Sequence, residues 1–111
     1  MQINPLGDDR VKVILKGRLD TPGVDRIETR FVAAVVPAGR HALVDLSEVE
    51  FVGSLGVRMF ISVARSLRLK QAQLLLIAPQ TQVHDMFDHV SLSDIIPICA
   101  DEAEAERTLD A

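Results

Sequence analysis

The sequence predicts a single α/β domain, with a mixed, mostly parallel β-sheet, an antiparallel edge strand at the N-terminus and about four helices. Its 111 residues have the usual length of one domain, so we expect one domain over residues 1–111. Hydrophobic residues make up 48% and charged residues 25%, a balance typical of a folded globular protein. Short apolar runs alternate with segments of helical periodicity, which indicates parallel strands joined by right-handed helical crossovers.

The N-terminal segment predicts an antiparallel hairpin. Apolar residues alternate with lysines through Arg10–Leu19, the pattern of a half-buried strand. Gln2–Pro5 is expected to pair with this strand across a turn at Gly7-Asp8-Asp9.

A first helix is expected directly after this hairpin. Thr21 supplies a capping hydroxyl and Pro22 suits the first helical position. Apolar residues at helical spacing between Val24 and Val35 give this helix one apolar face, and Pro37 ends it.

The rest of the chain predicts further strands and helices in alternation. His41–Leu46 and Gln73–Ala78 are short apolar runs expected of strands covered on both faces, and Ile95–Ile98 is a weaker run. Helical periodicity predicts helices over Ser54–Leu69 and Thr81–Val90. The acidic tail predicts a last helix capped by Asp101, with its acids near the positive end of the helix dipole.

The net charge of −4 is concentrated in this tail. From Asp101 onward there are five acids and one base, so the other 100 residues carry 11 of each. No acid occurs between Phe51 and His84, whereas three arginines and a lysine do. Because residues 1–100 have no net charge and the chain has no Trp or Tyr, we do not expect it to bind nucleic acid. The basic stretch instead favours docking of an acidic protein.

Several other classes of function are not expected. Cys99 is the only cysteine, which excludes an internal disulfide framework, and we expect it buried at a strand end. The apolar runs are too short to span a bilayer and no signal peptide is recognised, so we expect a cytoplasmic protein without membrane insertion. His84 and His89 point to different sides of their helix, so we expect no metal and no cofactor.

Ser54 is the first candidate site residue. It follows a buried strand at the start of a helix, where we expect its hydroxyl to cap the helix by accepting a backbone N–H. Unpaired N–H groups and the helix dipole also favour an anion there, so the fold would tolerate a phosphoryl group adding roughly −1.5 to −2 charges. From the spacing alone, a plain cap remains the simpler interpretation.

The second candidate is a basic face on the same helix. Arg58, Ser62 and Arg65 recur at helical spacing opposite the apolar residues, and we expect Met59 to lie exposed beside them as a contact residue. No acid within the helix can pair with the arginines. The sequence leaves two interpretations of the arginines open: they dock a partner, or they are simply solvated.

The segment from Val44 to Gly56 resembles the signature of the STAS family, the sulfate transporter and anti-sigma factor antagonist domains. In that family a strand ends in an Asp-Leu-Ser-like turn, and a phenylalanine and Asp-Ser-Ser/Thr-Gly follow. Gly17–Asp20, Leu74–Ile77 and Ser91–Ile98 also match, so the resemblance covers essentially the whole chain and implies a STAS-like fold.

The resemblance implies a non-enzymatic interaction module of the anti-sigma factor antagonist type. Ser54 falls on the position that is phosphorylated by the partner, an anti-sigma factor with serine kinase activity. Phe51 and Gly56 match the pattern, whereas Gly53 replaces an aspartate and Leu55 replaces a small hydroxyl residue. Gly53, Leu55 and Gly56 thus form the expected switch loop around Ser54.

Other functions remain open. The altered Gly53 and Leu55 suit a scaffold subunit that is not phosphorylated, as in STAS subunits of lipid-transport ATPases or stress-signalling complexes. Asp45 on a central strand and the Asp8-Asp9 pair suggest a receiver domain that phosphorylates its own aspartate. Against this, Asp8 and Asp9 precede a strand instead of ending one, and no lysine follows Lys70 to contact the phosphoryl group. Binding of a nucleotide or another anion at the Ser54 helix start is a further alternative.

Overall fold

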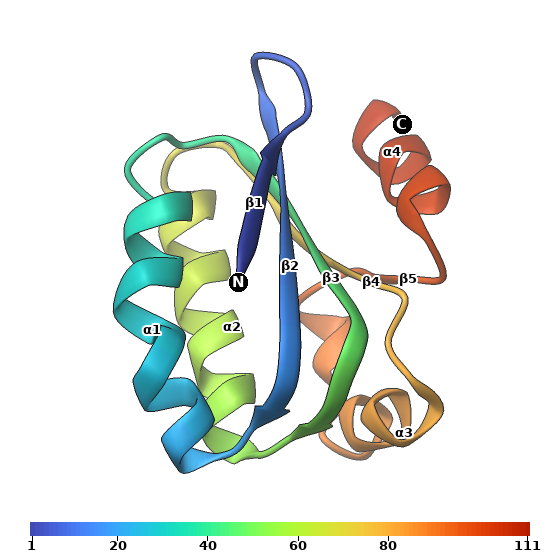
Figure 1. The fold of residues 1–111 in the computed structure, drawn as a ribbon. Helices are drawn as coiled ribbons and strands as arrows, with labels where there is room; N and C mark the ends of the chain where they lie inside the picture. The colour runs from blue at the N-terminus through green and yellow to red at the C-terminus, as the bar shows by residue number, and fades with distance from the viewer.

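A five-stranded sheet lies at the centre of the computed structural model, which describes residues 1–111 (Figure 1). The strands lie side by side in chain order; β1 is antiparallel to β2, and all other neighbours are parallel. The predicted fold class is therefore confirmed. The elements are β1 (Gln2–Pro5), β2 (Arg10–Leu19), α1 (Thr21–Val35), β3 (His41–Val52), α2 (Ser54–Arg68), β4 (Leu74–Ile77), α3 (Thr81–His89), the 3₁₀ helix η1 (Leu92–Asp94), β5 (Ile98–Cys99) and α4 (Glu102–Asp110).

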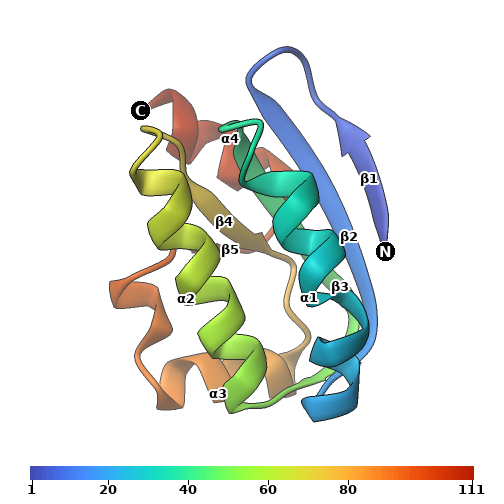
Figure 2. The ribbon, with the colours of Figure 1, turned by 90° about the vertical axis from the view of Figure 1, so that its left-hand side faces the viewer.

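The helices cover the sheet unequally. α1 and α2 lie against one face and α4 against the other, while α3 lies at the end where β2 and β3 finish (Figures 1 and 2). Alternate strand residues divide between the faces: Val44 and Leu76 join a core of 25 buried residues, whereas Leu43 and Leu75 join a separate cluster of five beneath α4. The main hydrophobic core thus lies under α1 and α2.

Strand β3 is six residues longer than predicted and ends at Val52 instead of Leu46. Its last residues pair with the end of β2, where Leu19 lies opposite Val52. The side chain of Gln80, at the start of α3, donates to the carbonyl of Ser47 at 2.8 Å and ties down this extension. Because β2 and β3 end together, the helices that follow them also start together.

Both predicted hydroxyl caps are wrong by one residue. The N-cap of α1 is Asp20, whose carboxylate accepts the N–H of Gly23 at 2.9 Å, and Thr21 is the first residue of the helix. The N-cap of α2 is Gly53, and no side chain caps that helix. The capping role predicted for Asp101 is confirmed, since it accepts the N–H of Glu104 at 2.8 Å.

The C-terminal part differs most from the expected strands. The run predicted as a strand over Ile95–Ile98 contributes only Ile98 to β5, because η1 and the turn after it take up the preceding residues. Cys99 is buried at the strand end, as expected.

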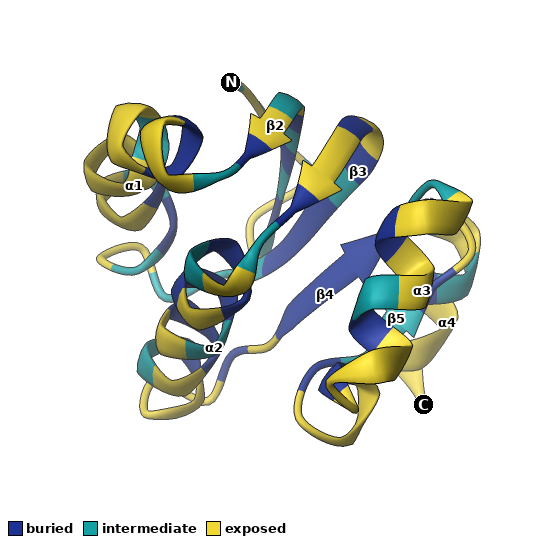
Figure 3. Ribbon diagram, turned by 90° about the horizontal axis from the view of Figure 1, so that it is seen from below, coloured by how far each residue is buried: buried dark blue, intermediate teal, exposed yellow.

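Figure 3 shows buried residues in the strands and on the inner helix faces, with the outer faces exposed. No helix has the length and apolar character needed to span a bilayer.

Candidate functional site

Ser54 is the exposed first residue of α2. The strand before it ends at Val52, and the N–H of Gly53 donates to the carbonyl of Leu19 at 3.0 Å, which ties the junction to β2. Gly53 has an extended backbone, with φ −92° and ψ −176°, so the chain turns into the helix directly at Ser54. The position is therefore both anchored and accessible to another protein.

The start of α2 leaves backbone N–H groups without a partner in the helix. The first helical hydrogen bond runs from the N–H of Val57 to the carbonyl of Gly53 at 3.1 Å, so the three N–H groups before Val57 have no partner within the helix. The first turn contains no acid and no capping side chain. A negative group on Ser54 would meet the positive end of the helix dipole without competition.

Gly53 leaves room for an aromatic side chain beside Ser54. Its backbone angles are open to any residue, but an added Cβ would come within 3.2 Å of the Phe51 ring. Phe51 is 39% exposed, and the guanidinium of Arg18 lies over its ring at 4.5 Å from the centroid. A cation–π pair between Arg18 and Phe51 therefore lies next to Ser54, and the missing side chain of Gly53 leaves space for the Phe51 ring.

Gly56 holds α2 close to the sheet. An added Cβ there would lie 2.9 Å from Cγ1 of Val52 and 3.3 Å from the carbonyl oxygen of Leu19. Leu55, between Gly56 and Ser54, is half-buried and packs against the main core. The loop expected to form a switch is therefore packed on the ends of β2 and β3, with Ser54 as its exposed residue.

The basic face extends from Ser54 along α2. Arg58, Ser62 and Arg65 are exposed, as predicted, and neither arginine forms an ion pair. Leu69, just beyond the helix, is 88% exposed. A shallow hollow of about 510 Å³ follows this face and is lined by Ser54, Val57, Arg58, Ile61, Ser62, Arg65, Ser66 and Leu69.

Met59 does not belong to this face. The prediction that it is an exposed contact residue is wrong, since it is 1% exposed and lies in the main core. Helix α2 packs against α1 as well as against β3 and β4, so it buries a wider stripe than a helix covering a sheet alone. Met59 falls within that stripe beside Phe60.

A second hollow, of about 340 Å³, lies on the other side of Ser54. It separates the start of α1 from the start of α2 and is lined by Leu19, Asp20, Thr21, Phe51, Gly53, Ser54 and Leu55. The backbone N–H of Gly23 and, to a lesser degree, Arg18 hold the pKa of Asp20 below its ordinary value. An ionised carboxylate thus lies at the rim of this hollow.

Sequence reasoning did not place Arg18, Asp20 and Thr21 in the site. They are more than thirty residues from Ser54 in the chain, and only the parallel pairing of β2 with β3 brings them beside it. The available signal was the strand order, because the carboxyl ends of adjacent parallel strands lie at one edge of the sheet.

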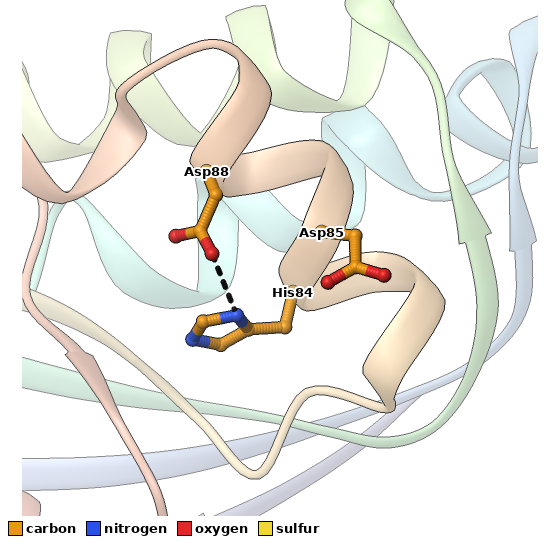
Figure 4. Close-up of side chains that lie close together, drawn as sticks. All are labelled: His84, Asp85 and Asp88. Atoms are coloured by element: carbon orange, nitrogen blue, oxygen red, sulfur yellow. Dashed lines mark ion pairs between the residues drawn. The ribbon is translucent and has the colours of Figure 1, made fainter.

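The structure brings His84 together with Asp85 and Asp88, not with His89 (Figure 4). Their possible ligand atoms lie within 4.8 Å of one another, and His84 Nδ1 is 3.2 Å from a carboxylate oxygen of Asp88. All three side chains are exposed on one helix, where a histidine and an aspartate four residues apart commonly pair. Nothing else in the structure points to an ion at this position.

Asp45 has its own partners within the sheet. Its carboxylate accepts the N–H of Ser47 at 2.8 Å and lies 3.7 Å from Nζ of Lys12. Asp8 and Asp9 lie in the turn before β2, whereas Asp45 is paired with Ile14, farther along that strand. The structure therefore does not bring together the acidic cluster that a receiver domain would use.

The molecule is a small α/β domain with an exposed serine at a helix start and a basic face without ion pairs beside it. The STAS domain family matches residues 3–105, and the chain belongs to this family.

Relatives and solved structures agree with this assignment. The anti-sigma-B factor antagonist of Listeria monocytogenes is 27% identical over 104 residues, which cover 94% of this chain and 91% of the relative. A STAS domain protein from Planctomyces limnophilus has a TM-score of 0.85 at 18% identity, with 99% of this chain and 97% of that chain covered. The unphosphorylated anti-sigma factor antagonist SpoIIAA has a TM-score of 0.79 at 20% identity, with coverage of 99% and 96%. The phosphorylated Bacillus form has a TM-score of 0.69 at 21% identity, with 97% of both chains covered.

Proposed function

We propose that this domain is an anti-sigma factor antagonist, which binds an anti-sigma factor in the cytoplasm and so frees a sigma factor. The observation that carries the proposal is the exposed Ser54 at an uncapped helix start, continuous with the arginine face of α2, in a chain of the STAS family. The similarity to the Listeria antagonist over nearly the whole chain supports the same role.

The basic face suits an acidic partner surface. Arg58 and Arg65 form no ion pairs within the chain, so no internal pair is broken when they meet carboxylates of the partner. Complementary charge raises the association rate and fixes the orientation of the two proteins. The exposed Leu69 adds an apolar contact at the far end of the face.

The switch in this proposal is phosphorylation of Ser54 by the anti-sigma factor, acting as a serine kinase. The new phosphoryl group would add about −1.5 to −2 charges one helical turn from Arg58 and offset the positive charge of the face. An acidic partner surface would then be repelled. SpoIIAA, which shares the fold, exists in both an unphosphorylated and a phosphorylated form.

Affinity capture with charge-reversed bait tests the binding face. The wild-type chain should retain an anti-sigma factor from a lysate of the source organism, and the Arg58→Glu/Arg65→Glu variant should lose it. Arg26→Glu/Arg30→Glu is the matched control, because it makes the same charge change at exposed positions of α1. Equal loss in both variants, or capture of a transporter ATPase instead, contradicts the proposed face or partner.

A phosphorylation assay tests the switch separately. The purified partner and ATP should place phosphate on Ser54, located by mass spectrometry, and Ser54→Ala should lose that phosphate. Modification should weaken binding by at least about tenfold, equivalent to ~1.4 kcal/mol. A partner that binds but leaves Ser54 unmodified would make this domain a binding module without the switch.

A further inference from the structure

Phe51 is the only phenylalanine at the surface of the molecule. The chain has four phenylalanines and no Trp or Tyr, and the side chains of Phe31, Phe60 and Phe87 are fully buried in the core. Phe51, by contrast, is 39% exposed at the end of β3. Its ring therefore offers apolar area for burial against another protein.

The end of β3 holds the backbone of Phe51 in place from both sides. On one side β3 pairs with β2, and the N–H of Gly53 donates to the carbonyl of Leu19 at 3.0 Å. On the other side Nε2 of Gln82 donates to the carbonyl of Glu50 at 3.3 Å. Because the strand end is already formed, little conformational freedom is lost when a partner covers the ring.

The side chain of Phe51 is held by Arg18. The guanidinium lies over the ring, 4.5 Å from its centroid, and its Nε donates to the carboxylate of Asp20 at 3.4 Å. The missing side chain of Gly53 leaves space on another side of the ring. Arg18, itself fixed by Asp20, therefore sets the orientation in which the ring is presented.

The Phe51 ring belongs to the same surface as Ser54. Both residues line the hollow of about 340 Å³, and Ser54 also lines the hollow of about 510 Å³ that follows the basic face of α2. Figure 3 views this end of the molecule, where β2 and β3 finish beside the starts of α1 and α2. A protein that docks on Arg58 and reaches Ser54 therefore meets Phe51 as well.

We propose that Phe51 is the anchor residue of the interface with the anti-sigma factor, and that Arg18 is the positioning residue that orients its ring; this inference rests on the proposed function. The matching site on the anti-sigma factor is an apolar pocket next to the acidic surface that receives Arg58 and Arg65. Aromatic side chains that fill such pockets commonly carry much of the binding energy of an interface. Ser54 then lies between an apolar anchor on one side and charged contacts on the other.

Calorimetric titration of the full chain with the anti-sigma factor tests the anchor. Phe51→Ala should weaken binding by at least about tenfold, and Phe51→Leu, which keeps part of the apolar area, should weaken it less. Ile3→Ala is the matched control, because Ile3 is 41% exposed on β1, at one edge of the sheet, and this variant should bind like the wild type. Circular dichroism checks that each variant is folded.

A double-mutant cycle tests the role of Arg18. Arg18→Gln alone should weaken binding several-fold, because the ring loses its cation–π contact, and Arg18→Lys should restore part of the affinity. In the Phe51→Ala background Arg18→Gln should have little further effect, since no ring remains to be oriented. An equal loss in both backgrounds would show that Arg18 does not act through Phe51, and would overturn its positioning role.

The possible outcomes separate this inference from the proposed function. Wild-type affinity in Phe51→Ala, with binding still lost in Arg58→Glu/Arg65→Glu, overturns the anchor and leaves the proposed function intact. A wild-type chain that binds no anti-sigma factor overturns both. A loss in Ile3→Ala as large as that in Phe51→Ala would show that any exposed apolar residue has this effect, which also overturns the anchor.

Discussion

Single glycines control how closely α1 and α2 approach the strand ends. At Gly23 an added Cβ would lie 1.9 Å from a backbone oxygen that cannot move aside, and at Gly56 it would lie 2.9 Å from a Val52 methyl group. At Gly53 it would meet only the edge of the exposed Phe51 ring, at 3.2 Å. The atom that an added Cβ would meet is thus rigid at Gly23 and easily displaced at Gly53, and Gly56 lies between these two cases.

We therefore expect graded losses of stability on substitution by alanine. Gly23→Ala should lower the free energy of unfolding by about 3 kcal/mol or more, Gly56→Ala by about 1–2 kcal/mol, and Gly53→Ala by less than about 1 kcal/mol. Urea denaturation followed by circular dichroism measures all three. A loss at Gly53 as large as that at Gly23 would contradict the geometry of the site.

Asp20 should make the domain sensitive to acid. Its pKa is lowered in the folded protein, first by the N–H of Gly23 and then by Arg18, so the ionised form favours folding. That stabilisation is present above the unfolded pKa of about 3.9 and is lost as the pH falls through the lower folded pKa. Asp20→Asn, which cannot titrate, should show a shallower decline in denaturation midpoint from pH 5 to pH 2.

The control for this experiment is Asp25→Asn, which removes an exposed carboxylate from α1 that does not cap the helix. It should follow the wild-type profile. Identical acid profiles for wild type and Asp20→Asn would show that the cap does not contribute to acid unfolding.

At the scale of elements, helix α4 is held to the sheet largely by charge. Glu102, Glu106 and Asp110 lie four residues apart on one stripe; Glu102 pairs with Lys12 at 3.0 Å, and the other two pair with Arg10. The pKa of Arg10 is raised, first by its hydrogen bond to Asp110, and that of Lys12 is raised, first by its hydrogen bond to Glu102. Ala105 is the only residue of α4 that is buried.

Breaking these ion pairs should open α4 and uncover Cys99. This thiol is 3% exposed beneath the helix, and burial raises its pKa, so it should react slowly in the native chain. Arg10→Gln, or a rise in salt that screens the ion pairs, should increase its rate of reaction with a thiol reagent several-fold. Since Cys99 is the only cysteine, the rate reports on this position alone.

Lys16→Gln provides the control, because Lys16 lies on the same strand but pairs at 3.9 Å with Glu48, away from α4. Its thiol reactivity should match that of the wild type. If urea accelerates the reaction with the full dependence measured for global unfolding, α4 does not open separately and the prediction fails.

The elements themselves were largely predictable, because period and turn residues are local signals. The strand order and the helix faces follow from them, and the exposed positions of Ser54, Arg58 and Arg65 were predicted. The errors arose where distant segments decide the outcome. Met59 is buried because α1 also packs against α2, and the last six residues of β3 are extended because β2 and Gln80 bind them.

At the scale of the whole molecule, residues 1–100 have no net charge, and the acidic residues 101–111 cover part of one face of the sheet. Residues 101–111 carry the entire net charge of −4, and they also shield the small apolar cluster that contains Leu43, Leu75 and Ile77. The tail therefore has two separable roles: it keeps the protein charged, and it keeps one face of the sheet away from solvent.

Deleting residues 101–111 should turn this face into a site of self-association. The shortened chain would have no net charge and would expose a flat apolar strip on β3 and β4, which favours association with a second copy. Analytical ultracentrifugation should show oligomers that increase with concentration, whereas the full chain should show none of this association.

A full-length variant separates the two roles of the tail. Asp25→Asn, Glu28→Gln, Glu48→Gln and Glu50→Gln together also bring the net charge to zero, but these exposed positions leave α4 in place. If association is prevented by the covering of the apolar cluster by α4, this variant stays monomeric while the shortened chain associates. Equal association of both would assign the effect to charge, and a shortened chain that stays monomeric would mean that the strip beneath α4 is too small to drive contact.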